Sequence, residues 1–393
     1  MSPLTCIMCL LVAVAALAAP VPARAQSITT SAPYAILVDA DSGSVLFEKN
    51  ADELMSPASM VKVMTAEIAF KAIKDGSLDP EQTFTISENA WRRGGAPSGG
   101  STMFAALNSN VRVIDLLRGI IIQSGNDAAI ALAEGMRGTD EVFAAAMTQR
   151  ARELGMSRST FKNSWGAFHA EQKTTARDLA TLGVHVIRTY PDLYKIYGET
   201  EFTWNRIRQL NRNPLLTMNI GADGLKTGNI DDSGFGLIGS AVESGTRLVV
   251  VVNGLKTARD RADEARKLLV WGLRAFDHRA LFAKGEVIGS ASVYGGAAGS
   301  VPLIADTAVR VMAPRGSSER LSGRIVWQGP IVAPVKAGDQ IARLRVYRGK
   351  TLALDIPLRA AQDVEVGGLH RRALDAGMEW VGGLFRRYVF KSG

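Results

Sequence analysis

The sequence predicts an α+β protein: helices covering an antiparallel sheet, then a small β-sandwich domain and a C-terminal amphipathic helix. Strand-like runs lie at both ends of the first large region, and helical spacing fills the residues between them, a pattern typical of a sheet covered by its intervening helices. Beyond about residue 278 the helical period disappears, and short alternating runs rich in Gly, Val and Ala replace it. The expected units are a leader over 1–25, the helix-covered sheet over 26–277, the β domain over 278–366 and the terminal helix over 367–393.

The first predicted element is a hairpin, because two alternating runs surround the turn-forming tripeptide Asp41-Ser42-Gly43. We expect the first hairpin and the last helix of this region to pack together. In chain order the predicted elements are strands over 34–39 and 45–49, a loop over 92–101, helical spacing over 114–155, a helix over 177–189, a strand beginning at 223–228, strands over 235–243 and 247–253, and a helix over 258–275.

A helix is also expected after the first hairpin. Ser56 is predicted as its N-cap and Pro57 as its first helical residue, since each residue type favours that position. Apolar residues continue at helical spacing until Asp75-Gly76. Ser59 and Lys62 would therefore lie in the first turns, where outward-pointing amides favour developing negative charge.

The last two units differ in the spacing of their apolar residues. Alternating runs in the β domain include 308–312, 323–327 and 340–347. In the last unit, apolar residues at helical spacing alternate with arginines, which indicates a basic amphipathic helix lying in a membrane surface. An ordinary helix packed on the preceding domain is the alternative. The apolar residues are Leu369, Leu374, Met378, Val381, Phe385 and Tyr388.

The composition is that of a globular protein with a sizeable core, with 393 residues, 47% hydrophobic and 21% charged. The formal net charge is +8, which is compatible with anionic partners. No run of Lys and Arg is interleaved with aromatic residues, so nucleic-acid binding is not expected.

The first 25 residues predict a secretory signal peptide. An apolar stretch, 7–19, precedes Ala23-Arg24-Ala25, which has the small-x-small pattern of a cleavage site. The segment before the apolar stretch holds no Lys or Arg, so an uncleaved N-terminal anchor stays open. We expect secretion across the cytoplasmic membrane to the periplasm, with peripheral attachment to the outer face of that membrane through the terminal helix.

Cysteine and histidine chemistry is not expected. Cys6 and Cys9 both lie in the leader, so the mature chain would hold no thiol. No histidine pair has metal-ligand spacing, and we expect no metal and no cofactor. The four histidines are His169, His185, His278 and His370.

Ser59-Met60-Val61-Lys62 places a hydroxyl and an amine on one face of the predicted helix, about one turn apart. A serine hydroxyl becomes a good nucleophile when a nearby base takes its proton. Lys62 can be that base if its surroundings keep it neutral. The motif alone is weak, because Ser-x-x-Lys occurs by chance in many helices.

Two further tripeptides make a catalytic interpretation of Ser59 and Lys62 more specific. Ser124-Gly125-Asn126 follows an apolar run, and Lys226-Thr227-Gly228 lies on a predicted edge strand. In this order the three motifs make a serine acyl-transfer site. They resemble those of the penicillin-recognising serine enzymes, and more narrowly the low-molecular-weight penicillin-binding proteins that are D-alanyl-D-alanine carboxypeptidases. The resemblance covers nearly the whole mature chain and includes 57–62, 123–128, 211–213, 223–228 and 267–272.

The resemblance implies a β-lactamase/transpeptidase-like fold and a role for each motif residue. Ser59 would attack the carbonyl between two D-alanines of a peptidoglycan pentapeptide and form an acyl-enzyme, and β-lactam antibiotics would inhibit by acylating the same serine. Lys62 would take the serine proton, its pKa lowered by burial and by the charge of Lys226. Ser124 would relay a proton to the leaving amine, and Asn126 would orient Lys62 and the substrate amide.

Substrate recognition is expected from a second group of residues. Lys226 and Thr227 would hold the terminal carboxylate, and Gly228, without a side chain, would let a peptide lie along its strand. Arg212 and Arg261 match family positions for anionic substrate or strand support. Where the family usually has a Gly-Leu stretch, this chain departs with Trp165-Gly166-Ala167-Phe168-His169, and we take His169 as structural.

Three alternatives remain open. A β-lactamase would need an activated water, and no Glu-x-x-x-Asn element lies between Ser124 and Lys226. A D,D-endopeptidase would use the same residues on crosslinked peptides. A non-catalytic penicillin-sensing or peptidoglycan-binding protein need not keep both lysines and Ser124.

Overall fold

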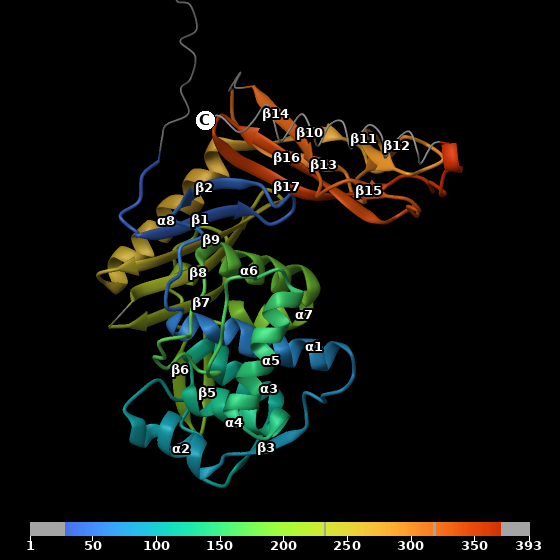
Figure 1. The fold of residues 1–393 in the computed structure, drawn as a ribbon. Helices are drawn as coiled ribbons and strands as arrows, with labels where there is room; N and C mark the ends of the chain where they lie inside the picture. The colour runs from blue at the N-terminus through green and yellow to red at the C-terminus, as the bar shows by residue number, and fades with distance from the viewer. Residues whose placement is uncertain (1–27, 232, 317–319, 371–393) are drawn as a thin grey trace, which may run out of the picture.

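The computed structural model describes residues 28–370 except 232 and 317–319. Figure 1 shows a helical part at one end, a sheet in the middle and a β domain that projects sideways from the other end. The leader over 1–25 and most of the terminal unit over 367–393 lie outside the described residues. Among the described residues, no helix combines the length and the apolar composition needed to cross a membrane.

The central sheet has five antiparallel strands in the order β2-β1-β9-β8-β7. Sequence-distant strands meet at β1 and β9, and β7 forms an edge, as expected for the strand that carries Lys226. The strand bounds are β1 Tyr34–Asp39, β2 Val45–Lys49, β7 Ala222–Ile230, β8 Gly234–Glu243 and β9 Thr246–Leu255.

Alternating side chains of the sheet face two different layers of helices. Ile36 and Val38 point into the core shared with α1 Lys62–Lys74 and α6 Ala176–Thr189. Leu37, between them, points to the other face, which α8 Ala258–Ala275 covers. The first hairpin and the last helix of this region therefore pack together, as predicted.

The helical part differs from the prediction in two places. The loop expected over 92–101 is partly helical: residues 92–94 end a helix whose N-terminus the Ser87 side chain caps by accepting from Ala90 N at 2.9 Å, and a 3₁₀ turn covers Ala96–Ser98. The helical spacing over 114–155 is interrupted at Ser124, whose φ of +65° cannot continue a helix. The helices are α2 Glu88–Gly94, α3 Val113–Arg118, a π-helical turn Gly119–Gln123, α4 Asn126–Arg137, α5 Asp140–Glu153 and α7 Pro191–Tyr194.

Short ribbons and 3₁₀ turns complete the first region. One ribbon pairs β3 with β4 and another pairs β5 with β6. Their bounds are β3 Thr83–Thr85, β4 Asn110–Arg112, β5 Glu201–Trp204 and β6 Ile207–Leu210, and the 3₁₀ turns cover Ala58–Val61, Ala96–Ser98, Lys195–Gly198 and Pro214–Thr217.

The β domain has a six-stranded sheet, in the order β14-β16-β17-β12-β11-β15, and a pair formed by β10 and β13. Both sheets contribute to one apolar core, in which Val311 from β13 joins Leu303 from β12 and Leu344 from β16. The bounds are β10 Phe276–Phe282, β11 Val287–Tyr294, β12 Ser300–Ile304, β13 Val309–Pro314, β14 Leu321–Val326, β15 Ile331–Val332, β16 Gln340–Arg348 and β17 Thr351–Ala360.

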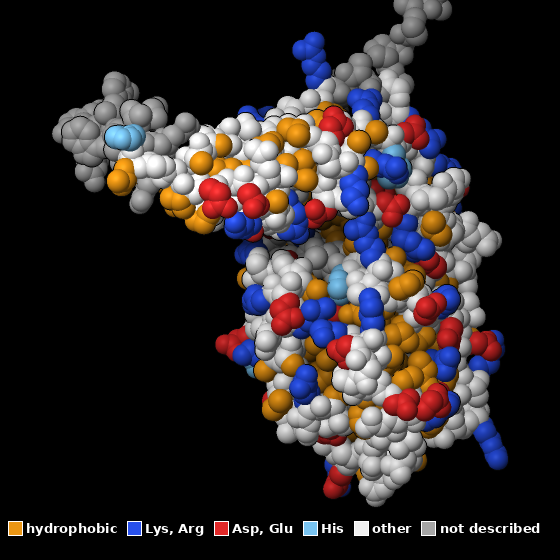
Figure 2. Space-filling view, turned by 90° about the vertical axis from the view of Figure 1, so that its right-hand side faces the viewer, with side chains coloured by type: hydrophobic (Ala, Val, Ile, Leu, Met, Phe, Trp, Pro, Cys, Tyr) orange, Lys and Arg blue, Asp and Glu red, His pale blue; other side chains and the backbone are white. Residues whose placement is uncertain are grey.

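The β domain is joined to the sheet through the first hairpin. Met312 N donates to Ser44 Oγ at 3.1 Å, and Arg348 donates to the carbonyl oxygen of Leu46 at 3.0 Å. The Arg348 guanidinium also lies 5.1 Å from the ring centroid of Phe276. Figure 2 shows the β domain projecting beyond the helical part of the molecule from this junction.

Candidate active site

Ser59 lies in the 3₁₀ turn that precedes α1, one residue after Ala58, whose φ is +46°. The predicted cap is wrong: Pro57 occupies the N-cap position, and no side chain caps the turn. Ser56 is tied instead to the sheet, where its carbonyl accepts from Asn253 Nδ2 at 3.4 Å. A residue other than glycine in the left-handed conformation is strained, and tight surroundings must hold it in place.

Two glycines provide those tight surroundings. A Cβ at Gly228 would come within 3.1 Å of Pro57 O and of Met60 Cγ. At Gly166, a Cβ would come within 2.4 Å of the carbonyl oxygen of the residue before Ser59, and φ there is +91°. A glycine is therefore needed at position 228 because the turn that carries Ser59 packs against it. This packing is a second reason for a glycine there, beside the expectation that a substrate peptide lies along its strand.

Lys62, the first residue of α1, is fully buried and makes three contacts at its side-chain nitrogen. Nζ lies 3.2 Å from Ser59 Oγ and 2.8 Å from Asn126 Oδ1. It also donates to the carbonyl oxygen of Trp165. Ser59, Lys62 and Asn126 are thus in direct contact, as their predicted roles require. Ser124, the remaining residue with a predicted role in proton transfer, does not take part in these contacts.

Burial lowers the pKa of Lys62 to about 7, because a charged amine is poorly stabilised away from water. The positive charge of Arg212 contributes to this lowering, and the carboxylates of Asp127 and Asp140 oppose it. The sequence-based expectation named Lys226 as the neighbouring cation. Lys62 and Lys226 do disfavour each other's positive charge, and Arg212 is a second cation that the expectation did not include. A lysine with this pKa is neutral in a large fraction of molecules at neutral pH.

Ser124 ends the π-helical turn in a left-handed conformation, and its side chain is only 2% exposed. Its Oγ has no hydrogen-bond partner among the described residues. A buried hydroxyl without a partner is uncommon and is consistent with a group that bonds a ligand. Gly125 N donates to Gly119 O at 2.9 Å, which closes the turn and starts α4 at Asn126.

Asp127 holds the segment 101–105 in place beside Asn126, a feature that was not predicted from the sequence. Its buried carboxylate accepts from Thr102 Oγ1 at 2.7 Å and from the backbone amides of Met103, Ala105 and Ala128 at 2.9, 3.1 and 3.0 Å. Burial raises the pKa of this carboxyl, and the donated hydrogen bonds oppose that rise. Asp127 directly follows the second motif, and this position was the feature of the sequence that could have indicated its role.

Lys226 and Thr227 lie buried on β7, 2% and 6% exposed. Lys226 Nζ donates to the backbone carbonyl of Thr227 at 3.0 Å. Burial holds the pKa of Lys226 well below its ordinary value, and the charges of Lys62, Arg212 and Arg261 act in the same direction. An arriving carboxylate would supply the counter-charge that this lysine lacks.

Both predicted arginines contribute charge to the site. Arg212 Nη1 donates to Ser101 Oγ at 2.8 Å, which joins it to the segment held by Asp127. Arg261 lies over the Phe235 ring at 5.7 Å, and its buried Nε has no partner among the described residues. The surroundings of Ser59 are therefore cationic, which suits a substrate that ends in a carboxylate.

The segment 163–172 forms the wall beside Lys62. Asn163 Oδ1 accepts from the amides of Gly166 and Ala167 at 2.7 and 3.0 Å, which fixes the neighbouring Trp165 carbonyl. His169 is exposed, and its Nδ1 accepts from Glu171 N at 3.1 Å, a local turn contact. The carbonyl of Trp165 could not be found from sequence, because every residue type carries one.

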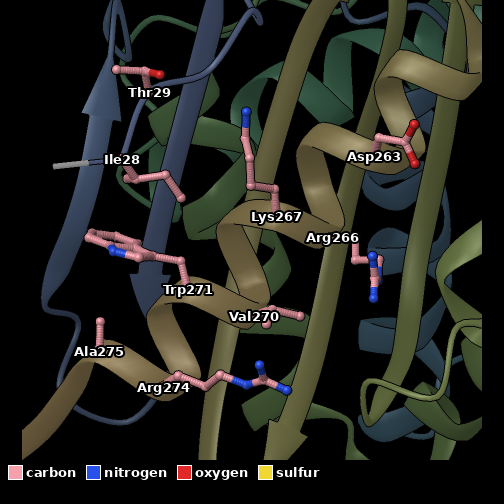
Figure 3. A pocket seen from close by; sticks show the side chains of 9 residues that line it. All are labelled: Ile28, Thr29, Asp263, Arg266, Lys267, Val270, Trp271, Arg274 and Ala275. Atoms are coloured by element: carbon pink, nitrogen blue, oxygen red, sulfur yellow. The ribbon is translucent and has the colours of Figure 1, made fainter. Parts of the chain in front are cut away.

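A groove of about 840 Å³ lies elsewhere, on the outer side of α8. Figure 3 shows Trp271 of that helix beside Ile28 of the N-terminal segment. Since α8 covers the sheet face opposite to α1, this groove is separate from Ser59. Among the described residues, no group of three His, Cys, Asp or Glu is placed to hold a metal ion.

Comparisons with known proteins agree with the geometry. Residues 21–257 match the family of D-alanyl-D-alanine carboxypeptidases described as Peptidase_S11. Residues 276–366 match the C-terminal domain of penicillin-binding protein 5. The chain is also 38% identical over 358 residues to the D-alanyl-D-alanine carboxypeptidase DacC of Escherichia coli, covering 89% of each chain.

Solved structures show the same architecture. Penicillin-binding protein 5 from Haemophilus influenzae is 35% identical, with a TM-score of 0.72, and the match covers 86% of this chain and 99% of that one. Penicillin-binding protein D2 from Listeria monocytogenes, solved in its ampicillin-bound form, is 28% identical with a TM-score of 0.57, covering 63% of this chain and all of the other.

Proposed function

Since the chain belongs to the D-alanyl-D-alanine carboxypeptidase family and is a serine-type enzyme of that class, we propose that Ser59 is its nucleophile and Lys62 its general base. The observation that carries this assignment is the contact of Lys62 Nζ with Ser59 Oγ and Asn126 Oδ1. The substrate is a peptidoglycan pentapeptide that loses its terminal D-alanine.

The hydrogen bonds of Lys62 explain how it can act as a base. A neutral amine has two N–H groups and one lone pair. The oxygens of Asn126 and Trp165 occupy the two N–H groups, so the lone pair is left for the Ser59 hydroxyl at 3.2 Å. As Ser59 Oγ bonds the carbonyl carbon between the two D-alanines, its proton passes to Lys62.

The leaving group then needs a proton. Ser124, with its buried and unpartnered hydroxyl, accepts a proton from Lys62 while giving its own to the departing D-alanine amine. The C–N bond breaks, and an acyl-enzyme on Ser59 remains. The backbone amide of Ser59 and one from β7 near Ile230 would stabilise the oxyanion, and such donors contribute about 3–4 kcal/mol each.

Lys226, Thr227 and the two arginines would bind the terminal carboxylate of the substrate. The motivating fact is that Lys226 is buried among cations, with its pKa held low. β7 is a sheet edge, so a peptide can pair with its outer side, with Gly228 packed against the Ser59 turn beneath. Water then takes the place of D-alanine and releases the shortened peptide.

Mass spectrometry with penicillin and with a pentapeptide tests these assignments. Wild type should gain one penicillin adduct and release D-alanine, and Ser59→Ala should do neither. Ser124→Ala should acylate about 10²–10⁴-fold more slowly. The exposed Ser157 provides a control, since Ser157→Ala should behave as wild type. A wild-type protein without an adduct would contradict the assignment of Ser59.

The same experiment separates the alternatives. An adduct with rapid turnover of penicillin and no D-alanine release would favour a β-lactamase. Release of monomers from a crosslinked peptide dimer would add D,D-endopeptidase activity. Against the β-lactamase, Glu171 in the wall segment is 67% exposed and pairs with Lys162 at 2.7 Å, so its carboxylate is held at the surface.

We further propose the units and the location of the protein. A signal peptide over 1–25 directs the chain to the periplasm, the catalytic unit spans 26–277, the β domain spans 278–366, and a helix over 367–393 attaches it to the membrane surface. The sequence patterns at the two ends support this proposal.

A further inference from the structure

The outer face of the β domain carries an unusual arrangement of arginines. In the register of β14 and β16, Arg324 lies directly opposite Arg345, and Arg343 follows two positions along the same face. Like charges at directly opposed positions destabilise a sheet. Negative charge close to these arginines would offset the repulsion between them.

One carboxylate offsets only part of that charge. Asp355 on β17 lies 2.6 Å from Arg343 Nε and 3.2 Å from Arg345 Nε. Arg324 lies over the Tyr347 ring, 5.8 Å from its centroid. Arg343 and Arg345 remain 43% and 41% exposed, so they can still contact a ligand from solvent.

Arg343 and Arg345 border a hollow of about 540 Å³, which we call the arginine groove. Besides Arg343 and Arg345, its lining includes the side chains of Trp327, Gln328 and Gln340. Trp327 is 41% exposed, far more than is usual for so large an aromatic side chain. An exposed aromatic ring beside amides offers a stacking surface and hydrogen bonds, the combination that suits a sugar ring.

The groove continues toward the catalytic unit. Arg343 also lines a second hollow of about 520 Å³, whose other walls include Arg177 and Val184 of α6 and Val45 of the first hairpin. Figure 2 shows Lys and Arg side chains gathered where the β domain meets the helix-covered sheet. A long ligand could therefore lie on the β domain and extend over the junction.

We propose that the arginine groove binds a strand of peptidoglycan away from the bond being cut, with stem-peptide carboxylates on the arginines and a sugar ring on Trp327. This inference rests on the proposed function, since that function supplies a polymer with both chemistries. Guanidinium groups bind carboxylates in a planar, bidentate manner, which fits the exposed Arg343 and Arg345. The groove would hold the polymer near the enzyme and raise the local concentration of pentapeptide ends.

Co-sedimentation with purified peptidoglycan sacculi tests the proposal. The mature chain is first acylated with penicillin, so that binding at Ser59 is blocked. Arg343→Gln/Arg345→Gln and, separately, Trp327→Ala should each weaken binding at least fivefold. A matched double variant, Lys284→Gln/Arg310→Gln, removes the same charge from exposed positions of the β domain outside the groove and should bind as wild type.

Three further measurements sharpen the result. Sacculi stripped of their stem peptides should bind more weakly, and binding should fall between 0.05 and 0.5 M salt as ionic contacts are screened, the Debye length shrinking from roughly 14 to 4 Å. Arg345→Gln should weaken sacculus binding, because Arg345 lines the groove, while raising the melting temperature, because it removes one of the two directly opposed charges. A merely structural role for these arginines would lower both.

Soluble substrates distinguish this inference from the proposed function. All groove variants should acylate with penicillin and release D-alanine from a soluble pentapeptide at the wild-type rate. Equal sacculus binding by wild type and the Arg343/Arg345 variant would overturn the groove while leaving the enzyme assignment intact. Loss of binding to anionic phospholipid vesicles with sacculus binding unchanged would also overturn it, in favour of a membrane contact.

Discussion

The side-chain nitrogen of Lys62 lies 2.8 Å from Oδ1 of Asn126, a residue 64 positions further along the chain. Together with the Trp165 carbonyl, this contact fixes the direction of the lysine lone pair toward Ser59. Proton transfer therefore depends on three segments that meet only in the folded protein: the start of α1, the start of α4 and the wall segment 163–172.

The first prediction is a pH dependence of acylation. Lys62 must be neutral to accept a proton, and it is neutral above its pKa of about 7. The rate of penicillin acylation should therefore rise through pH 7 and level off above pH 8. Stopped-flow acylation with a fluorescent penicillin measures this profile. A rate that is flat between pH 5 and 9 would mean that another base acts on Ser59.

The second prediction concerns Arg212, whose charge disfavours a protonated Lys62. Replacing it in Arg212→Gln should raise the pKa of Lys62, so the rising part of the acylation profile should move to higher pH. At pH 7 the rate should fall for that reason. Arg208→Gln is the control, because Arg208 is exposed and pairs with Glu201; its profile should match wild type.

A third prediction concerns the glycine behind the nucleophile. Gly166→Ala places a Cβ within 2.4 Å of the Ala58 carbonyl and should slow acylation strongly by shifting the Ser59 turn. Gly138→Ala is matched in its positive φ, which is +82°, but a Cβ there would have no atom within 4 Å. Both variants should lose about 1–2 kcal/mol of stability, because a residue with a Cβ is disfavoured at positive φ. If both variants acylate at the wild-type rate, the packing against Ala58 has no effect on the nucleophile.

A fourth prediction addresses stability. Glu67 is fully buried on α1, and its Oε1 accepts from Arg150, His185 and Tyr190 at 2.9–3.2 Å. Glu67→Ala would leave Arg150 partly buried without this partner, and such a change typically lowers the free energy of unfolding by about 3–5 kcal/mol.

Denaturant unfolding measures this change. Glu153→Ala serves as its control, because Glu153 contacts the same Arg150 but is 48% exposed, so its effect should stay within about 0.5 kcal/mol. Similar losses for the two variants would show that burial of Glu67 is unimportant. Acylation per folded molecule should be unchanged in both.

The fifth prediction concerns the terminal unit. Removing the residues after Gly368 should release the protein from membranes and leave soluble carboxypeptidase activity intact. Binding of the full chain to anionic vesicles should weaken with salt, because part of it is electrostatic. Membrane sedimentation that is the same with and without these residues would contradict the proposed attachment.

Several elements could be predicted because their signals are local. Alternation predicted β1 and β2 to the residue, and helical spacing predicted α8 over 258–275. The capping prediction at Ser56 was wrong, because the backbone of that residue bonds Asn253 on a distant strand instead. Capping by a serine is a local preference, and tertiary contacts can override it.

The candidate site could be predicted in part. Its motif residues were found because catalysis requires particular side chains in a particular order. The Trp165 carbonyl and the close approach at Gly166 could not be found in that way. Every residue has a backbone carbonyl, and a short contact between distant segments cannot be recognised in one sequence.

By itself, the sequence determined which side chains are available for the proposed chemistry: a serine, two lysines and an asparagine in three ordered motifs, on a helix, a helix end and an edge strand. Only the tertiary structure decided how reactive that chemistry is. The pKa of Lys62 depends on complete burial and on Arg212, and its lone-pair direction depends on Asn126 and Trp165. Both are properties of distance and desolvation, which arise when segments far apart in the chain are brought together.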